Sequence, residues 1–323
     1  MGFPRPRVVF SRCLTFANCR YNGQIIASEA VEQFKRFFDC TTPCPEADIG
    51  LGIPRDPIRI VRRENRLRLV QPATERDLTD EMLGFARGFL DTLGPVDGFV
   101  LKSRSPSCGL TDVKMFGETS EGSALPGKIS GFFGGAVLER FPQVAIEDEG
   151  RLTNFSIREH FLTRVYISAR FRMLEERPSM AGLVQFQAEN KLLFMAYNQT
   201  RMRELGRIVA NLERLPVAEV FKRYAERLPL AFARQPRFNS AINVLQHGAG
   251  YFKDKVSARE KGFLADALES FRSGRVPLSV PQSIIRAWVA RFDVPYLEQQ
   301  TFFRPYPEEL QFISDSGKGR KTS

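Results

Sequence analysis

The stretch GFVLKSRSPSCGLTD, residues 98–112, shows how the N-terminal part of the chain is built. Its first residues are mostly apolar and predict a short buried strand, and the polar, Pro-containing remainder predicts a loop around Cys108. The same order occurs near the start, where VVFS (residues 8–11) predicts a strand that leads directly to Cys13. Two cysteines therefore follow the carboxyl ends of predicted strands.

Segments with helical spacing of apolar residues separate these strands. Thr79 is expected to cap one of the helices. The predicted helices are 28–40, 79–93 and 130–141, and further strands are predicted at 58–63 and 143–150. Alternating strands and helices over the first ~150 residues imply a parallel sheet with helices on both faces, a Rossmann-like α/β fold. Binding sites in such sheets lie beyond the carboxyl ends of the strands.

The segment TTPCPEADIGLGIPRDP, residues 41–57, is dense in Pro and Gly. This composition predicts a long shaped loop, and the loop carries Cys44 and Glu46. We expect its backbone to serve a site.

Long amphipathic segments replace the strand pattern from Leu152 onward and predict helices. Prolines at 178, 216, 229 and 236 are expected at helix ends. The expected domains are an α/β domain at 1–150, a helical connector at 151–179, an all-α domain at 180–310 and a flexible tail at 311–323.

Composition limits the class of protein. A chain of 323 residues with 43% hydrophobic residues can build real cores. No run approaches the ~20 apolar residues of a membrane span, and the start lacks the apolar run of a secretory signal, so we expect a cytoplasmic protein without a membrane partner. The five cysteines form an odd set without a CxxC pair, which argues against disulfides and a zinc ribbon and leaves thiolate ligation open.

The net charge of +10 is unevenly distributed. Residues 1–150 carry 19 basic and 20 acidic side chains, whereas the remainder carries 28 basic and 17 acidic ones. This excess favours a phosphate-bearing partner, either a small nucleotide or a nucleic acid, because Lys and Arg neutralise phosphates. The alternative is an ordinary solvated surface.

Three short stretches together carry the chemistry: SRCLTFANCRYNG (11–23), CPEADIGLGIPRDP (44–57) and SPSCG (105–109). Spacing alone would be weak support for ligation, because lone cysteines are often small buried hydrophobes. In this order, however, the stretches resemble the thiouracil desulfidase family over roughly residues 5–150, although Asn22 stands where the family pattern has Asp.

The resemblance implies a 4Fe-4S cluster whose protein ligands are Cys13, Cys44 and Cys108, with one iron left open. Cys19 and Cys40 lie outside the matched ligand positions, and we expect both to have packing roles. An open iron suits a soft sulfur atom.

Residues 180–310 resemble a second family, of unknown function, that is often fused to the first. Its pattern leads us to expect His at the position of Gln187, whereas His247 matches. We expect His247 to be a structural residue near a helix start.

The resemblance also implies a non-redox reaction, in which water replaces the sulfur of a thiolated uracil compound and sulfide is released. Glu46 is the expected general base, and Ser105 or Ser107 the hydrogen-bond donor to the ring, a choice that the sequence leaves open. The residues expected to shape the substrate pocket are Arg20, Tyr21 and Arg55.

Three readings of the whole chain remain at this point. In the first, the substrate is a small thiolated pyrimidine such as thiouridine monophosphate, with its phosphate held by Lys or Arg of the second domain or of a domain cleft. The second is a tRNA-directed thiouridine desulfidase or thiolase, whose binding would be sensitive to salt. The third, an iron-sulfur stress regulator that engages nucleic acid, ranks last because the sequence shows no helix-turn-helix signature.

Overall fold

A computed structural model of the protein describes residues 2–117 and 124–312. The chain divides into two compact units, one formed by residues 1–169 with the segment that begins at Leu310, the other by residues 170–309. Each is described by itself. Most of the expected tail, residues 311–323, lies outside the described residues.

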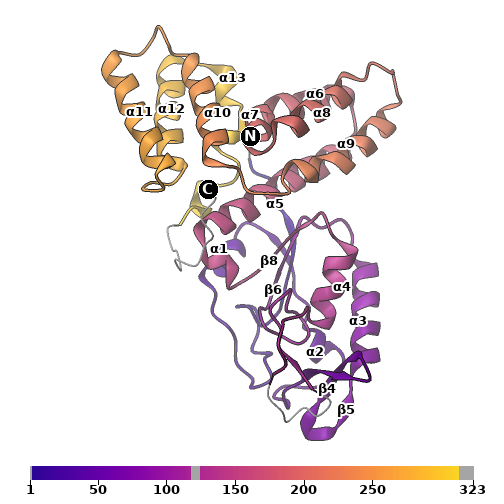
Figure 1. Ribbon diagram of the computed structural model, residues 1–323. Coiled ribbons are helices and arrows are strands. Elements are labelled where there is room, and N and C mark those ends of the chain that lie inside the picture. The colour runs from indigo at the N-terminus through magenta and orange to yellow at the C-terminus, as the bar shows by residue number, and fades with distance from the viewer. Residues whose placement is uncertain (1, 118–123, 313–323) are drawn as a thin grey trace. The chain divides into compact units, whose positions relative to one another are not determined.

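The first unit, indigo to magenta in Figure 1, is built on a parallel sheet. Its strand order is β2-β1-β6-β8. Its strands are β1 (Arg7–Phe10), β2 (Asp39–Thr41), β6 (Gly98–Leu101) and β8 (Ala145–Asp148). Every neighbouring pair is parallel. The fold class predicted from the sequence is therefore confirmed.

The helix predicted at 28–40 is shorter than expected, because its last residues belong to strand β2. Ser28 does cap the helix, but α1 (Glu29–Phe34) ends at Phe34. The helical spacing continues through Phe38, yet this side chain packs against Phe10 of β1 at a centroid distance of 6.4 Å. The next three residues then pair with β1, a contact between distant parts of the chain that local spacing does not contain.

One face of the sheet is covered by α3 (Thr79–Thr92) and α4 (Phe132–Arg140). Both helices share a hydrophobic cluster with the sheet, whose buried members include Val9, Phe99, Leu101, Met82, Ala86, Leu90, Phe133 and Val137. The prediction that Thr79 caps α3 is wrong. Its hydroxyl instead accepts the backbone N–H of Leu69 at 2.8 Å and joins the helix to the neighbouring strand.

The opposite face is covered by α1 and the first part of α5 (Phe155–Glu175). Phe34 of α1 stacks on Phe161 of α5 with centroids 6.0 Å apart, and Phe38 lies between Phe10 and α5. Each of these buried aromatic rings stabilises the fold by roughly 2–3 kcal/mol. Helices therefore lie on both faces, as the strand-helix alternation predicted.

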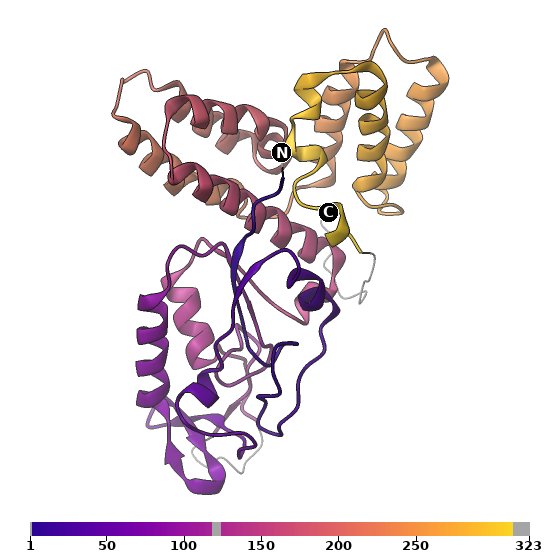
Figure 2. The same cartoon turned by 180° about the vertical axis from the view of Figure 1, so that it is seen from behind.

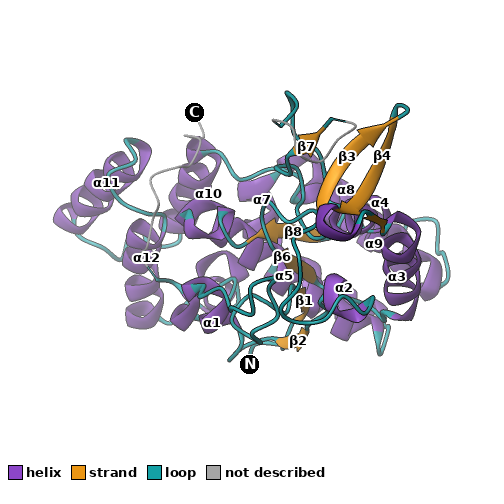
Figure 3. Ribbon diagram, turned by 90° about the horizontal axis from the view of Figure 1, so that it is seen from below, coloured by secondary structure: helices purple, strands orange, loops and turns teal. Residues whose placement is uncertain are grey.

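A second sheet with the order β5-β4-β3-β7 completes this unit. Its members are β3 (Arg59–Arg63), β4 (Arg66–Gln71), β5 (Arg76–Asp77) and β7 (Met115–Phe116). Figure 3 shows β3 and β4 as an antiparallel hairpin. The strand predicted at 58–63 thus exists, but it belongs to this mixed sheet and not to the parallel one. A short helix, α2 (Pro45–Asp48), lies within the loop expected at 41–57.

Residues 170–309, all of which the structure describes, contain helices and no strand (Figure 2). After α5 come α6 (Met180–Glu189), α7 (Lys191–Tyr197), α8 (Gln199–Ala210), α9 (Val217–Ala231), α10 (Phe238–Gly250), α11 (Ala258–Arg272), α12 (Ser279–Phe292) and α13 (Pro295–Glu298). No helix of the described residues is both long and apolar enough to cross a bilayer.

Two expectations for this unit are wrong. Pro229 lies inside α9 rather than at its end, in the last turn, where a missing N–H removes only one helical hydrogen bond. His247 lies in the last turn of α10, exposed and edge-on to Tyr251, and not near a helix start. Gln187 accepts the buried hydroxyl of Tyr224 at 2.7 Å, which gives that position a packing role.

Candidate functional site

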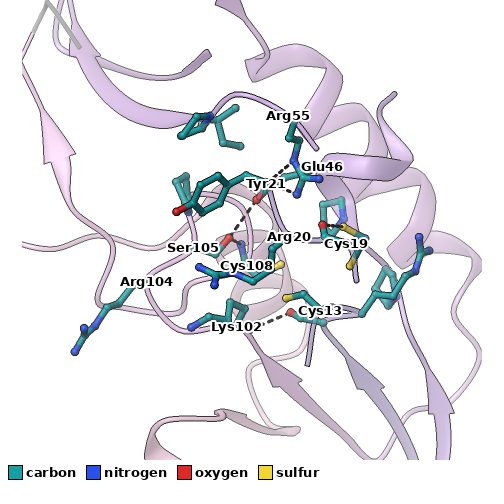
Figure 4. A pocket seen from close by; sticks show the side chains of 18 of the residues that line it. Cys13, Cys19, Arg20, Tyr21, Glu46, Arg55, Lys102, Arg104, Ser105 and Cys108 are labelled. Atoms are coloured by element: carbon teal, nitrogen blue, oxygen red, sulfur yellow. Dashed lines mark hydrogen bonds and ion pairs between the residues drawn. The ribbon is translucent and has the colours of Figure 1, made fainter. Parts of the chain in front are cut away.

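Three loops that follow adjacent parallel strands bring Cys13, Cys44 and Cys108 to one pocket (Figure 4). Cys13 follows β1, Cys44 follows β2 and Cys108 follows β6, and these strands are neighbours in the order β2-β1-β6. The pocket has a volume of about 320 Å³. It lies where the carboxyl ends of parallel strands meet, the usual place for a site in this architecture.

The loops of Cys13 and Cys44 are tied together by one ion pair. Asp48, at the end of α2, accepts the backbone N–H of Cys44 at 3.0 Å. The same carboxylate pairs with Arg12 at 3.0 Å, and Arg12 also donates to the carbonyl of Thr42 at 2.8 Å. Because each partner adjoins a cysteine loop, the pair fixes one loop against the other.

The loop of Cys108 is fixed by hydrogen bonds, some of them from two glycines at the start of helix α4 that lie close to the loop backbone. The hydroxyl oxygen of Ser105 accepts the backbone N–H of Cys108 at 3.1 Å. Gly131 and Gly134 of the α4 N-terminal turn donate their backbone N–H groups to the carbonyls of Gly109 and Ser107. A Cβ at Gly134 would lie 2.3 Å from the carbonyl oxygen of Gly109, so glycine is required there.

Glu46 lies in the same pocket with partners on both carboxylate oxygens. Its Oε2 accepts Nε and a terminal nitrogen of Arg55 at 3.0 and 2.7 Å. Its Oε1 accepts the hydroxyls of Ser107 at 3.0 Å and of Ser105 at 3.4 Å. The Arg55 side chain is only 3% exposed, so this ion pair is buried and holds the carboxylate in one orientation.

The two serines that the sequence could not separate differ in position. Ser105 lines the pocket, whereas Ser107 is fully buried behind it and does not. Both contact Glu46. Only Ser105 is placed to meet a molecule in the pocket.

The expected substrate residues also lie at the pocket. Arg20 stacks over the ring of Tyr21 at 5.4 Å, and Tyr21 is 41% exposed. The Tyr21 carbonyl accepts the backbone N–H of Arg55 at 2.7 Å, which ties the Cys13 loop to the Cys44 loop. The structure thus brings together Arg20, Tyr21, Arg55 and Glu46 around the three thiols.

Burial, and for Cys44 also a neighbouring thiol, hold Cys44 and Cys108 in their neutral form. Burial raises the pKa of Cys108 to about 12. A hydrogen bond with Cys19, and then burial, raise the pKa of Cys44. At neutral pH these groups are protonated in the metal-free protein, so a bound metal must displace protons.

No group of three or more His, Cys, Asp or Glu in residues 2–117 and 124–312 is arranged to hold a metal ion. The thiols nevertheless fit an iron-sulfur cluster by chemistry. Thiolates are the soft ligands that such clusters require, and three of them reach one pocket from separate loops.

Sequence reasoning missed several pocket residues. Cys19 was assigned a packing role, but it lines the pocket. Arg12 and Lys102 line it as well, and Lys102 pairs with Glu149 of the segment after β8. Arg12 adjoins Cys13, and Lys102 directly follows strand β6, and these positions were the available signals.

Comparison with known proteins finds a family match for each part of the chain. Residues 8–149 match the family model of 2-thiouracil desulfurase, and residues 191–307 match a family of unknown function, DUF1722. The uncharacterized protein YbgA of Escherichia coli (strain K12) is 27% identical over 46% of this chain and 89% of its own length. The uncharacterized protein YbbK of Bacillus subtilis (strain 168) is 29% identical over 32% of this chain and 72% of its own.

Among solved structures, the [4Fe-4S]-dependent thiouracil desulfidase TudS is 25% identical to this chain. The match covers 46% of this chain and 93% of that one, with a TM-score of 0.36. The family models confirm the resemblance seen in the cysteine motifs: residues 8–149 match the 2-thiouracil desulfurase model, and residues 191–307 match that of DUF1722.

Proposed function

We propose that this chain is a desulfidase that hydrolyses the thiocarbonyl of a thiolated uracil compound, using a 4Fe-4S cluster held by Cys13, Cys44 and Cys108. The observation that carries the proposal is the convergence of three thiols, a partly buried carboxylate and a serine hydroxyl on one pocket. The family match of residues 8–149 supports the substrate class.

The reaction consumes one water and releases one hydrogen sulfide, without net electron transfer. When bound, a cluster with three thiolate ligands would supply an open iron, a Lewis acid suited to a soft sulfur atom. Glu46 accepts one proton from the water as the water oxygen bonds to the ring carbon. When the carbon–sulfur bond breaks, that proton and the remaining proton of the added hydroxyl leave with the sulfur as hydrogen sulfide, and the carbon–oxygen double bond forms.

The surrounding side chains hold this geometry. Arg55 fixes one oxygen of Glu46 and leaves the other, Oε1, with serine hydroxyls alone. Ser105, which lines the pocket, orients the ring by turning its single O–H from Glu46 to an oxygen or nitrogen of the ring. The ring of Tyr21 and the guanidinium of Arg20 form a wall on which a pyrimidine can stack.

Anaerobic reconstitution with iron and sulfide, followed by a sulfide-release assay on 2-thiouracil, 4-thiouracil, their nucleosides and monophosphates, tests this function. We expect stoichiometric sulfide and the oxygenated pyrimidine. A protein with a full complement of iron that releases sulfide from none of these compounds contradicts a small-molecule desulfidase. Equal rates for base, nucleoside and monophosphate would exclude a phosphate site.

A second candidate, thiolated tRNA as substrate, is favoured by one observation. Residues 170–309 contain 22 Lys and Arg against 15 Asp and Glu, whereas residues 1–150 are nearly balanced. An excess of cations in a separate unit is suited to a nucleic acid backbone. Thiouridine-containing tRNA belongs in the same assay, and sulfide release from it alone would decide for this candidate.

A further inference from the structure

Cys19 lies in the proposed cluster pocket although it is not one of the three ligands. Its side chain is 1% exposed and lines the same pocket as Cys13, Cys44 and Cys108 (Figure 4). Its backbone N–H donates to the carbonyl of Ala17 at 2.9 Å, which fixes this part of the first cysteine loop. The pocket therefore contains a fourth thiol.

This thiol contacts two of the three proposed ligands. It interacts with the thiols of both Cys13 and Cys44. The Cys44 thiol also lies 3.8 Å from the carbonyl oxygen of Cys19. A sulfur in contact with two ligand sulfurs lies within reach of any cluster that those ligands hold.

Cys40 shows what a cysteine outside the site looks like in this protein. It lies on β2, half-buried, and its thiol donates to the carbonyl of Phe38 at 3.6 Å. It does not line the pocket. Packing thus accounts for Cys40, whereas Cys19 is surrounded by thiols at the place where a soft ligand would act.

We propose that Cys19 is a reserve ligand: without substrate its thiolate binds the iron that the other three cysteines leave open, and a substrate sulfur displaces it. This inference rests on the proposed function. In the exchange the bond from iron to Cys19 breaks, a bond from iron to the incoming sulfur forms, and the released thiolate takes a proton from solvent. No electron is transferred. The reserve ligand shields the open iron from oxidants between turnovers.

The consequence is a competition that can be measured. Any soft ligand that binds the open iron must first displace Cys19. Its apparent dissociation constant is therefore the intrinsic constant divided by the fraction of protein in which Cys19 is not bound to the iron. If one molecule in ten is free, removal of Cys19 tightens binding about tenfold.

Mössbauer spectroscopy of full-length, ⁵⁷Fe-loaded protein without substrate tests the ligand set directly. We expect four equivalent thiolate-bound irons in the wild type and in the control Cys40→Ala, and one distinct iron in four in Cys19→Ala. Sodium sulfide should bind Cys19→Ala about tenfold more tightly than the control. One distinct iron in four in the substrate-free wild type, unchanged by Cys19→Ala, would overturn the proposal.

If Cys19→Ala fails to fold, the wild type alone still tests the proposal. Its Mössbauer spectrum should show four equivalent irons before sodium sulfide is added and one distinct iron in four afterwards. Sulfide release from 2-thiouracil is measured on the same samples. If the wild type releases sulfide but already shows one distinct iron without substrate, the reserve ligand is rejected and the proposed function stands. A wild type that binds no four-iron cluster rejects both this inference and the proposed function.

Discussion

The carboxylate of Glu46 has unequal surroundings at its two oxygens. The first is held by the buried guanidinium of Arg55, and the second accepts the hydroxyls of Ser105 and Ser107. An amide in its place could still accept from Arg55 and donate to Ser105, so the shape of the pocket would be kept. The amide would lose the ability to take up a proton, and also the negative charge that pairs with Arg55.

Glu46→Gln is therefore expected to lower the turnover number about 10²- to 10⁴-fold, the usual contribution of a general base. Iron content and the visible spectrum should stay unchanged. Sulfide release by the reconstituted variant measures the effect. Glu64→Gln, in the exposed turn between β3 and β4, is the matched control, and full activity of Glu46→Gln would remove this residue from the mechanism.

At the level of elements, helix α4 determines where the Cys108 loop lies. Its first turn donates backbone N–H groups to loop carbonyls, which satisfies donors that a helix start leaves free. The contact is so close that a Cβ at Gly134 would lie 2.7 Å from the carbonyl oxygen of Cys108 itself. The atoms that such a Cβ would meet belong to the backbone, so they cannot move aside as the end of a flexible side chain could.

Gly134→Ala is expected to displace this loop, with a loss of roughly 1–3 kcal/mol in the free energy of unfolding and a faster loss of iron to a chelator. Urea unfolding and iron release measure the two effects. Gly135→Ala is the control, since its Cβ meets only Ser130 at 3.4 Å and alanine favours helix. Equal iron retention in both variants would refute the role of α4.

His160 makes α5 sensitive to acid. Burial, and then the charge of Arg164, lower the pKa of this imidazole to about 3 in the folded protein, against 6.5 as its ordinary value. Below pH 6.5 the unfolded chain binds a proton that the folded protein does not, so the free energy of unfolding falls as the pH falls from 6.5 toward 3.

We expect the wild type to lose on the order of 2–3 kcal/mol between pH 6.5 and pH 4 through this residue. His160→Gln should remove that part of the loss and leave the pH dependence above 7 unchanged. Urea unfolding at a series of pH values provides the measurement. Parallel curves for variant and wild type below pH 6.5 would show that His160 is not the group responsible.

For the whole molecule, the unequal distribution of charge is the main signal of a partner. The basic excess lies beyond residue 150, whereas the proposed active site lies in residues 8–149. A surface that neutralises many phosphates releases counterions on binding, so its affinity falls steeply with salt.

If thiolated tRNA is the substrate, its KM should rise at least tenfold between 50 and 200 mM salt, while the KM for free 2-thiouracil stays constant. Initial rates of sulfide release at both salt concentrations give the comparison. A salt-independent KM for tRNA, or an equal effect on both substrates, argues against a nucleic acid surface.

Much of the α/β unit follows from local patterns. Apolar runs at 8–11 and 98–102 predicted β1 and β6, and helical spacing predicted α3 and α4, because a buried strand and an amphipathic helix each leave a local imprint. Strand β2 left none, since Asp39–Thr41 is a short polar edge segment that becomes a strand only by pairing with β1. Pairing between distant residues is not encoded in local spacing.

The sequence by itself determined the chemistry: which cysteine motifs are present, which family they resemble, and that Glu46 and two serines accompany them. Only the tertiary structure decided how these groups are combined. It put the three cysteine loops after adjacent strands, buried Ser107 behind Ser105, and brought Cys19 against Cys13 and Cys44. Residue types reveal what a side chain can do, whereas distances between loops far apart in the chain arise from strand order and packing.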